Sequence, residues 1–314
     1  MKRRFLLQAT AIAAPAALGL PAISRAASAG TLKIGYQKSS TALVLLKHRG
    51  WLEQKLAPQG YDVGWAEFPS GPPMLEALSA GAVNFAFTGE TPPIFSQASG
   101  TPVVYVANSL KHLHGEAILV KESSGITSLA GLKGQSVAVQ KGSSSHYLLV
   151  AALLKAGVKF TDITPVYLAP SDARAAFQTG AVAAWAIWDP FYAAEQAATQ
   201  VRVLTEAAGV VPNHDFYLSR RDFAEKNGAA LNAAVAQVQE IEGWVAKNRP
   251  AAATEIAASI GLPAPVLLAS FNRATYGVNK ISPEVLVEQQ KVADTFYQLH
   301  LIPTPITVAD AAWS

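Results

Sequence analysis

Short apolar segments alternate with amphipathic segments from Thr31 onward, and this order constrains the fold more than any other feature of the chain. Residues 31–36 (TLKIGY) read as the first strand, and residues 41–56 follow with apolar side chains near helical spacing. The same alternation continues to residue 188. Strands that alternate with helices are typical of α/β proteins with a mainly parallel sheet. We therefore predict an α/β fold.

Two apolar segments indicate that the chain crosses between two lobes. Residues 117–120 begin a second series of strands and helices, and residues 216–218 read as a strand that returns to the first unit. The 314 residues suffice for two such units. Two crossings make a two-stranded hinge, which permits closure around a ligand. The predicted lobes are residues 30–116 with 218–314, and residues 117–217.

Residues 1–29 are typical of an export signal. Three basic residues open the chain, an apolar stretch follows, and Ala27 and Ala29 form an A-x-A pattern. The apolar stretch is short for a membrane span and is interrupted by proline and glycine. We predict cleavage after Ala29 and a periplasmic protein, exported by the Sec or the twin-arginine route.

Composition excludes several classes of function. The chain has no cysteine, so it has no disulfides, thiolate metal sites or cysteine nucleophile. The formal charge of +3 arises from the first 29 residues, because the remainder carries 21 basic against 22 acidic residues. Binding to a phosphate backbone requires a basic excess. We therefore expect no nucleic-acid partner.

The segment from Gly142 to Ser145 is the strongest candidate for a binding site. It stands between a predicted strand and a predicted helix. Glycine allows close approach of the backbone, the hydroxyls of Ser143, Ser144 and Ser145 can donate, and the first helical N–H groups point into the same space. The alternative is an ordinary serine cap on a surface helix.

Two further strand ends carry polar residues. Thr88, Gly89 and Glu90 follow one predicted strand, and Gln37 and Lys38 follow the first strand. In open α/β sheets, ligands bind outside the carboxyl ends of the strands. We predict that these residues lie around the same cleft, although Thr88 to Glu90 could also be a capping turn.

An aromatic cluster ends the strand at residues 183–188. The positions of Trp185 and Trp188 differ by three, an odd number, so on a regular strand the two side chains face opposite sides. We predict Trp188 as an apolar wall of the cleft and Trp185 as core. Asp189 can accept hydrogen bonds from a ligand, or it can hold the turn before Pro190.

Two patterns invite an interpretation as an active or metal site. Ser143 and His146 could serve a hydrolase, but the sequence has no G-x-S-x-G motif. His112 and His114 could bind a metal, but no third ligand is nearby, and a solvated pair is the preferred interpretation. We predict neither catalytic residues nor a metal.

Several stretches together resemble the periplasmic aliphatic sulfonate-binding proteins of ABC uptake systems. The stretches are residues 34–38, 68–72, 74–78, 88–93, 140–146 and 184–190. The resemblance covers nearly all of the chain after residue 29. Taurine, nitrate and pyrimidine-precursor binders share the same fold.

The resemblance implies a monomeric two-lobed binding protein without a cofactor, which delivers its ligand to a membrane permease. It also implies that Gln37, Thr88, Gly89 and the region of Ser143 to Ser145 hold the sulfonate, with Trp188 near the alkyl part. Glu90 departs from the family, in which aspartate is the residue that we expect at this position.

A sulfonate suits neutral donors, because it is a permanent monoanion with three acceptor oxygens. Helix termini and hydroxyls can hold such a charge without a full countercharge. The alternatives are a taurine or nitrate binder of the same fold, or an enzyme related to pyrimidine-precursor synthesis.

Overall fold

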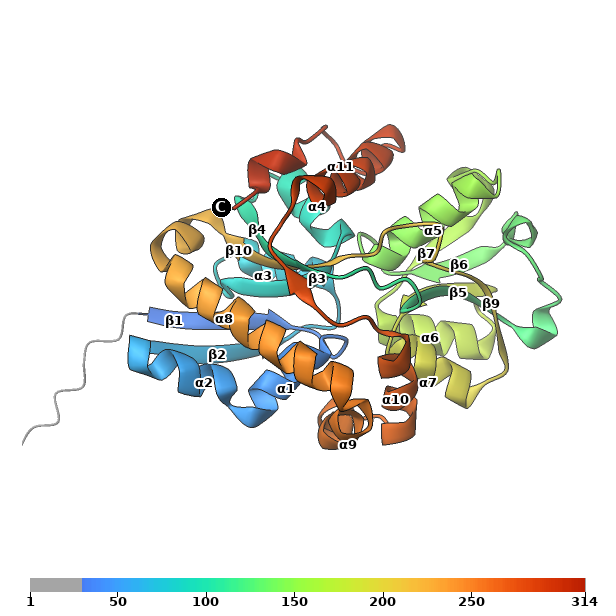
Figure 1. Ribbon diagram of the computed structural model, residues 1–314. Helices are drawn as coiled ribbons and strands as arrows, with labels where there is room; N and C mark the ends of the chain where they lie inside the picture. Colours follow the sequence, from blue (N-terminus) through green and yellow to red (C-terminus); the bar gives the residue numbers. More distant parts are fainter. Residues whose placement is uncertain (1–29, 314) are drawn as a thin grey trace, which may run out of the picture.

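The computed structural model of the protein describes residues 30–313 and contains two lobes, each built around one β-sheet (Figure 1). The predicted export signal and its cleavage after Ala29 lie outside the described residues. The prediction of a two-lobed α/β fold is confirmed. None of the helices between residues 30 and 313 is both long and apolar enough to span a bilayer.

The first sheet has the strand order β11-β4-β10-β3-β1-β2. The strands are β1 Gly30–Tyr36, β2 Tyr61–Glu67, β3 Phe85–Gly89, β4 Val103–Ser109, β10 Asp215–Arg220 and β11 Val278–Asn279. Strands β1, β2 and β3 are parallel, whereas β10 is antiparallel to both β3 and β4.

The second sheet has the order β7-β6-β8-β5-β9. Its strands are β5 Glu116–Lys121, β6 Ser136–Val139, β7 Thr164–Tyr167, β8 Ala184–Trp188 and β9 Val201–Glu206. Here β6 is parallel to β7 and β8, but β5 is antiparallel to β8 and β9. The expectation of a mainly parallel sheet is therefore wrong in part. Strand β5 follows the first crossing and β10 follows the second, and each runs antiparallel to both of its neighbours, so both sheets are mixed.

Helices cover both faces of the first sheet. They are α1 Thr41–Arg49, α2 Trp51–Leu56, α3 Gly71–Ser79, α4 Thr91–Ala98, α8 Arg221–Lys247, α9 Arg249–Ile260, α10 Ala264–Arg273 and α11 Pro283–Gln298. Side chains that alternate along β4 enter two different cores: Val104 and Val106 pack with α1 and α8, and Tyr105 packs with α3 and α11. This alternation follows from the twofold period of a strand.

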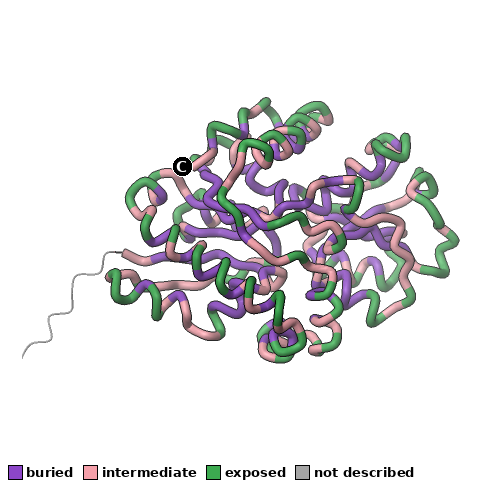
Figure 2. Tube along the Cα trace, viewed as in Figure 1, coloured by how far each residue is buried: buried purple, intermediate pink, exposed green. Residues whose placement is uncertain are grey.

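The second lobe adds α5 Ser144–Lys155, α6 Pro170–Thr179 and α7 Phe191–Ala198. The core that contains Tyr105 continues into this lobe through α5, where Leu148 and Leu149 are fully buried. Phe296 of α11 stacks edge-on against Phe95 of α4 and packs 6.0 Å from the ring of Tyr147. Figure 2 shows that the buried segments concentrate at the sheets of both lobes.

The structure differs from the sequence-based expectations in four places. The helix predicted over residues 41–56 is two helices, because Gly50 adopts the left-handed conformation with φ 63°. Strand β3 extends to Gly89, and α5 already begins at Ser144. Strand β9, which the sequence analysis missed, is half-buried along its length and so lacks a continuous apolar run.

The two crossings run beside each other. The N–H of His112 donates to the carbonyl of Asn213 at 2.9 Å, and the amide of Asn213 donates to the carbonyl of His112 at 2.7 Å. The N–H of Ala208 also donates to the carbonyl of Leu113. Residues 110–115 and 207–214 therefore form a hydrogen-bonded pair of connections between the sheets.

Candidate functional site

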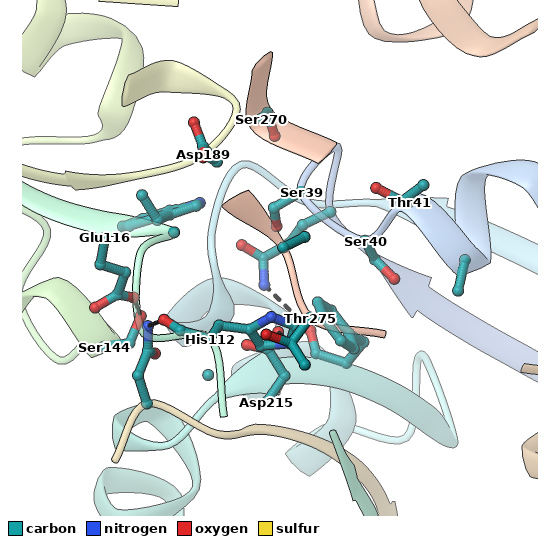
Figure 3. Close-up of a pocket in the computed structure, with 18 of the residues that line it drawn as sticks. Ser39, Ser40, Thr41, His112, Glu116, Ser144, Asp189, Asp215, Ser270 and Thr275 are labelled. Carbon is teal, nitrogen blue, oxygen red and sulfur yellow. Dashed lines mark hydrogen bonds and ion pairs between the residues drawn. The ribbon is translucent and has the colours of Figure 1, made fainter. Parts of the chain in front are cut away.

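A cavity of about 110 Å³ lies between the lobes and is lined by residues from both (Figure 3). Six of the residues predicted from the sequence line it: Gln37, Gly89, Ser143, Ser144, Trp188 and Asp189. They come from the ends of β1, β3 and β8 and from the beginning of α5. The carboxyl ends of parallel strands thus converge on the cavity, as in other open α/β sheets.

The other predicted residues lie behind or beside this lining. Lys38 donates to the carbonyl of Ile260 at 3.0 Å, on the surface of the first lobe. Thr88 is fully buried, and its hydroxyl donates to the carbonyl of Gly89. Glu90 is 1 % exposed, and neither of its carboxyl oxygens has a hydrogen-bond partner among the described residues.

Gly142 and Ser145 support the start of α5 and do not line the cavity. The N–H of Gly142 donates to Nδ1 of His146 at 3.2 Å, and Gly142 has the positive φ of 73° that favours glycine. The hydroxyl of Ser145 lies 3.0 Å from that of Ser143.

The hydroxyls at the beginning of α5 are already hydrogen-bonded within the protein. Ser143 caps the helix by accepting from the N–H of His146, and its hydroxyl donates to the carbonyl of Gln140 at 2.7 Å. The hydroxyl of Ser144 donates to the carboxyl group of Glu116, the first residue of β5. The predicted anion site at this helix therefore faces a carboxyl group.

Among the described residues, no hydrogen bond joins the ring of His146 to a serine hydroxyl. Its Nδ1 accepts from Gly142, and the ring packs against Phe160, Tyr167 and Phe296. Burial lowers the pKa of His146 to about 4, so the ring is neutral at pH 7. This arrangement holds the turn before α5 and does not resemble a base positioned on a nucleophile.

Acidic side chains are unusually frequent around the cavity. Burial raises the pKa of Glu116 to about 8, so much of this group keeps its proton at neutral pH. Burial and the nearby Glu116 raise the pKa of Glu90 well above its usual value. Burial also raises the pKa of Asp215, although His112, 3.3 Å away, opposes that shift.

Asp189 forms an ion pair with an arginine of the opposite lobe. Nη2 of Arg273, in α10, lies 2.8 Å from Oδ1 of Asp189, and Nε lies 2.9 Å from Oδ2. Arg273 also donates to Gln196 of α7 and stacks 4.0 Å from the ring centroid of Tyr192. We call Asp189 with Arg273 the interlobe ion pair. The sequence identified Asp189 but gave no indication of its partner, which is 84 residues away.

Aromatic rings form the apolar part of the lining. Trp188 lines the cavity, whereas Trp185 is fully buried in the core of the second lobe. The other rings are Phe87, Tyr217, Phe271 and Tyr276. These rings provide apolar surface for the tail of an organic ligand.

Several lining residues were missed by the sequence analysis. They include Ser39, Ser40, Thr41, His112, Glu116, Asp215, Tyr217, Glu242, Ser270, Phe271, Ala274, Thr275 and Tyr276. Ser39, Ser40 and Thr41 had a detectable signal, because three hydroxyl residues stand directly between a strand and a helix. Glu242 had none, since it is an unremarkable position in the long helix α8.

The sequence analysis considered His112 and His114 as possible metal ligands. Within residues 30–313, no group of three His, Cys, Asp or Glu side chains is placed to hold a metal ion. His112 pairs with Asp215, and His114 lies 2.6 Å from Glu206 instead. Each histidine thus has its own carboxylate partner.

The chain is similar to known binding proteins over most of its length. A family model described as NMT1/THI5 like matches residues 37–252. A protein of Escherichia coli (strain K12), named as an aliphatic sulfonates-binding protein, is 44% identical over 293 residues, which are 93% of this chain and 91% of that protein.

Two solved structures share the two-lobed architecture. The alkanesulfonate-binding protein SsuA from Xanthomonas axonopodis pv. citri, bound to MOPS, has a TM-score of 0.87 and 38% identity, over 92% of this chain and 99% of its own. The periplasmic aliphatic sulphonate binding protein SsuA from Escherichia coli has a TM-score of 0.83 and 44% identity, over 90% and 92% of the two chains.

Proposed function

This chain belongs to the NMT1/THI5-like family, and on that premise we propose that it is the substrate-binding component of an ABC importer for aliphatic sulfonates. It is a binding protein and not an enzyme. We further propose that it acts as a monomer in the periplasm and passes its ligand to a membrane permease. The similarity to periplasmic sulfonate-binding proteins supports this proposal.

The observation that carries the proposal is the chemistry of the cavity lining. Among the described residues, those that line the cavity carry hydroxyls, amides and aromatic rings, together with four carboxyl groups and His112, but they include no lysine or arginine. A sulfonate carries a single charge that it cannot lose, so neutral donors and helix N-termini can hold it. A fully ionised phosphate, with more charge, would be opposed by the surrounding carboxyl groups.

We propose that the ligand lies between the lobes, which are residues 30–116 with 218–314 and residues 117–217. The paired crossings would act as the hinge. Six predicted residues would surround the ligand: Gln37, Gly89, Ser143, Ser144, Trp188 and Asp189. Trp188 would contact the alkyl tail, and Asp189 would act by closing the lobes through Arg273.

Calorimetric titration tests this function. We expect ethane- to octanesulfonate to bind, with affinity rising about fourfold for each additional methylene that is buried. Recovery of the bound sulfonate unchanged after prolonged incubation would distinguish a binding protein from an enzyme. Binding of nitrate or sulfate in preference to every sulfonate would refute the ligand class.

A second ligand, taurine, is favoured by the acidic lining. Glu242 lines the cavity, accepts from the N–H of Gly277 at 2.6 Å, and has its pKa raised to about 7 by burial. A carboxylate beside the aromatic rings of Tyr217 and Tyr276 could bind an ammonium group. Comparing taurine with ethanesulfonate in the same titration decides between an amine-bearing and a plain alkyl tail.

A further inference from the structure

We propose that the negatively charged head group of the ligand binds at the N-terminus of α1, between Ser39 and Ala42, and not at the N-terminus of α5. This inference rests on the proposed function, because it places the sulfonate of that ligand. Ser39, Ser40, Thr41 and Ala42 all line the cavity.

Helix α1 presents free donors to the cavity. It has nine residues, and its first helical hydrogen bond runs from the N–H of Val44 to the carbonyl of Ser40 at 3.0 Å. The N–H groups of Ala42 and Leu43 precede that bond, so they have no partner within the helix. No side chain caps α1, and its first turn contains no acidic residue. Such a terminus attracts an anion.

Ser40 gives an independent indication. It is 2 % exposed, and its hydroxyl has no hydrogen-bond partner among residues 30–313. Buried hydroxyls are almost always paired in folded proteins. A ligand oxygen beside the free N–H groups of α1 would supply the missing acceptor.

The beginning of α5 is poorly suited to the same anion. Ser143 already caps that helix, and the hydroxyl of Ser144 already donates to Glu116. Figure 3 shows Glu116 and Ser144 on the side of the cavity opposite Ser40 and Thr41. An anion at α5 would meet the carboxyl group of Glu116, which already takes the hydroxyl of Ser144, whereas Ser39, Ser40 and Thr41 offer hydroxyl groups at the beginning of α1.

Gln37 and Lys38, the two residues before Ser39, form hydrogen bonds with other parts of the first lobe. The amide of Gln37 donates to the carbonyl of Phe87 at 3.1 Å, which orients it at the end of β1. The ammonium group of Lys38 is directed away, toward Ile260 and Glu67. The site therefore binds through neutral dipoles, which suits a monoanion that never takes up a proton.

A pair of isosteric variants tests the charge of the site. Ser40→Asp places a carboxylate at the cap position, where it accepts from the helix N–H groups. We expect the fold to be retained and alkanesulfonate affinity to fall roughly a hundredfold or more. Ser40→Asn has the same size without the charge, and we expect it to bind at least tenfold more tightly than Ser40→Asp.

A second variant removes one backbone donor. Ala42→Pro deletes the N–H of Ala42, which forms no helical hydrogen bond. Helix α1 of this variant would begin with Thr-Pro, as α4 already does at Thr91 and Pro92. We expect a loss of roughly tenfold in affinity with the circular dichroism unchanged. Ser282→Ala, at the cap of the distant helix α11, is the control and should bind normally.

Comparing sulfonates of different tail length distinguishes a lost contact to the head group from a lost contact to the alkyl tail. Because the sulfonate is common to all ligands, Ala42→Pro should weaken ethanesulfonate and octanesulfonate by the same factor. A loss that grows with tail length would overturn the assignment, as would full affinity in Ala42→Pro or in Ser40→Asp. If no sulfonate binds the unchanged protein, the proposed function itself is refuted.

Discussion

Closure of the two lobes depends on the absence of a side chain at Gly89. A Cβ atom at this position would lie 2.7 Å from Cβ and 2.8 Å from Oγ of Ser144, in the opposite lobe. Cβ contacts below 3.0 Å essentially never occur. Gly89 does not have a positive φ, so its backbone accepts alanine. Gly89→Ala should therefore oppose closure without disturbing either lobe.

The expected magnitude follows from overpacking. Forcing one additional methyl group into a tight contact costs about 1 to 3 kcal/mol. Because the clash is between atoms of opposite lobes, separating the lobes would relieve it, so its cost should appear in the apparent Kd, which would rise roughly 5- to 150-fold. The assay is calorimetric titration with an alkanesulfonate, combined with small-angle scattering of the liganded protein to detect incomplete closure.

Two variants serve as controls for this prediction. In a Ser144→Gly background the clashing atoms are gone, so the additional effect of Gly89→Ala should largely disappear. Gly243→Ala should leave binding unchanged, because its Cβ would meet nothing within 4 Å. An unchanged Kd for Gly89→Ala, or an equal loss in the Ser144→Gly background, would refute the reasoning.

Two further predictions concern buried carboxyl groups. Asp189→Asn breaks the interlobe ion pair and leaves Arg273, whose side chain is 19% exposed, without its partner. Ligand dissociation, measured by stopped flow, should therefore accelerate about tenfold or more. The exposed Asp172→Asn is the control and should release ligand at the normal rate, and equal rates for both variants would contradict the role of the pair. Burial raises the pKa of Glu116 from its ordinary value of 4.5 to about 8 in the folded protein. Between pH 4.5 and about pH 8, the folded state therefore keeps a proton on Glu116 that the unfolded state has lost, and stability falls as the pH rises through this range. Thermal unfolding from pH 5 to 9 should therefore show a smaller decline for Glu116→Gln, and parallel curves would argue against a raised pKa.

The sequence alone was sufficient for much of the fold, because the information is local. Apolar periodicity located most strands and helices of both lobes, and the two crossings were visible as single apolar segments near residues 117 and 217. The boundary between α1 and α2 could also have been predicted, because glycine often ends a helix in the left-handed conformation, as Gly50 does here. The mixed direction of the sheets was not visible, because strand direction is set by the path of the chain and not by side-chain pattern.

The candidate site shows the same division between local and distant information. Strand ends and hydroxyl-rich turns marked Gln37, Gly89, Ser143 and Trp188, which line the cavity. Only the tertiary structure brought Glu116 against Ser144, 28 residues away, and Arg273 against Asp189. Those contacts decide which helix terminus is free to bind an anion. Hydrogen-bond partners that are distant in the chain leave no periodic signal, so no reading of the sequence alone can reveal them.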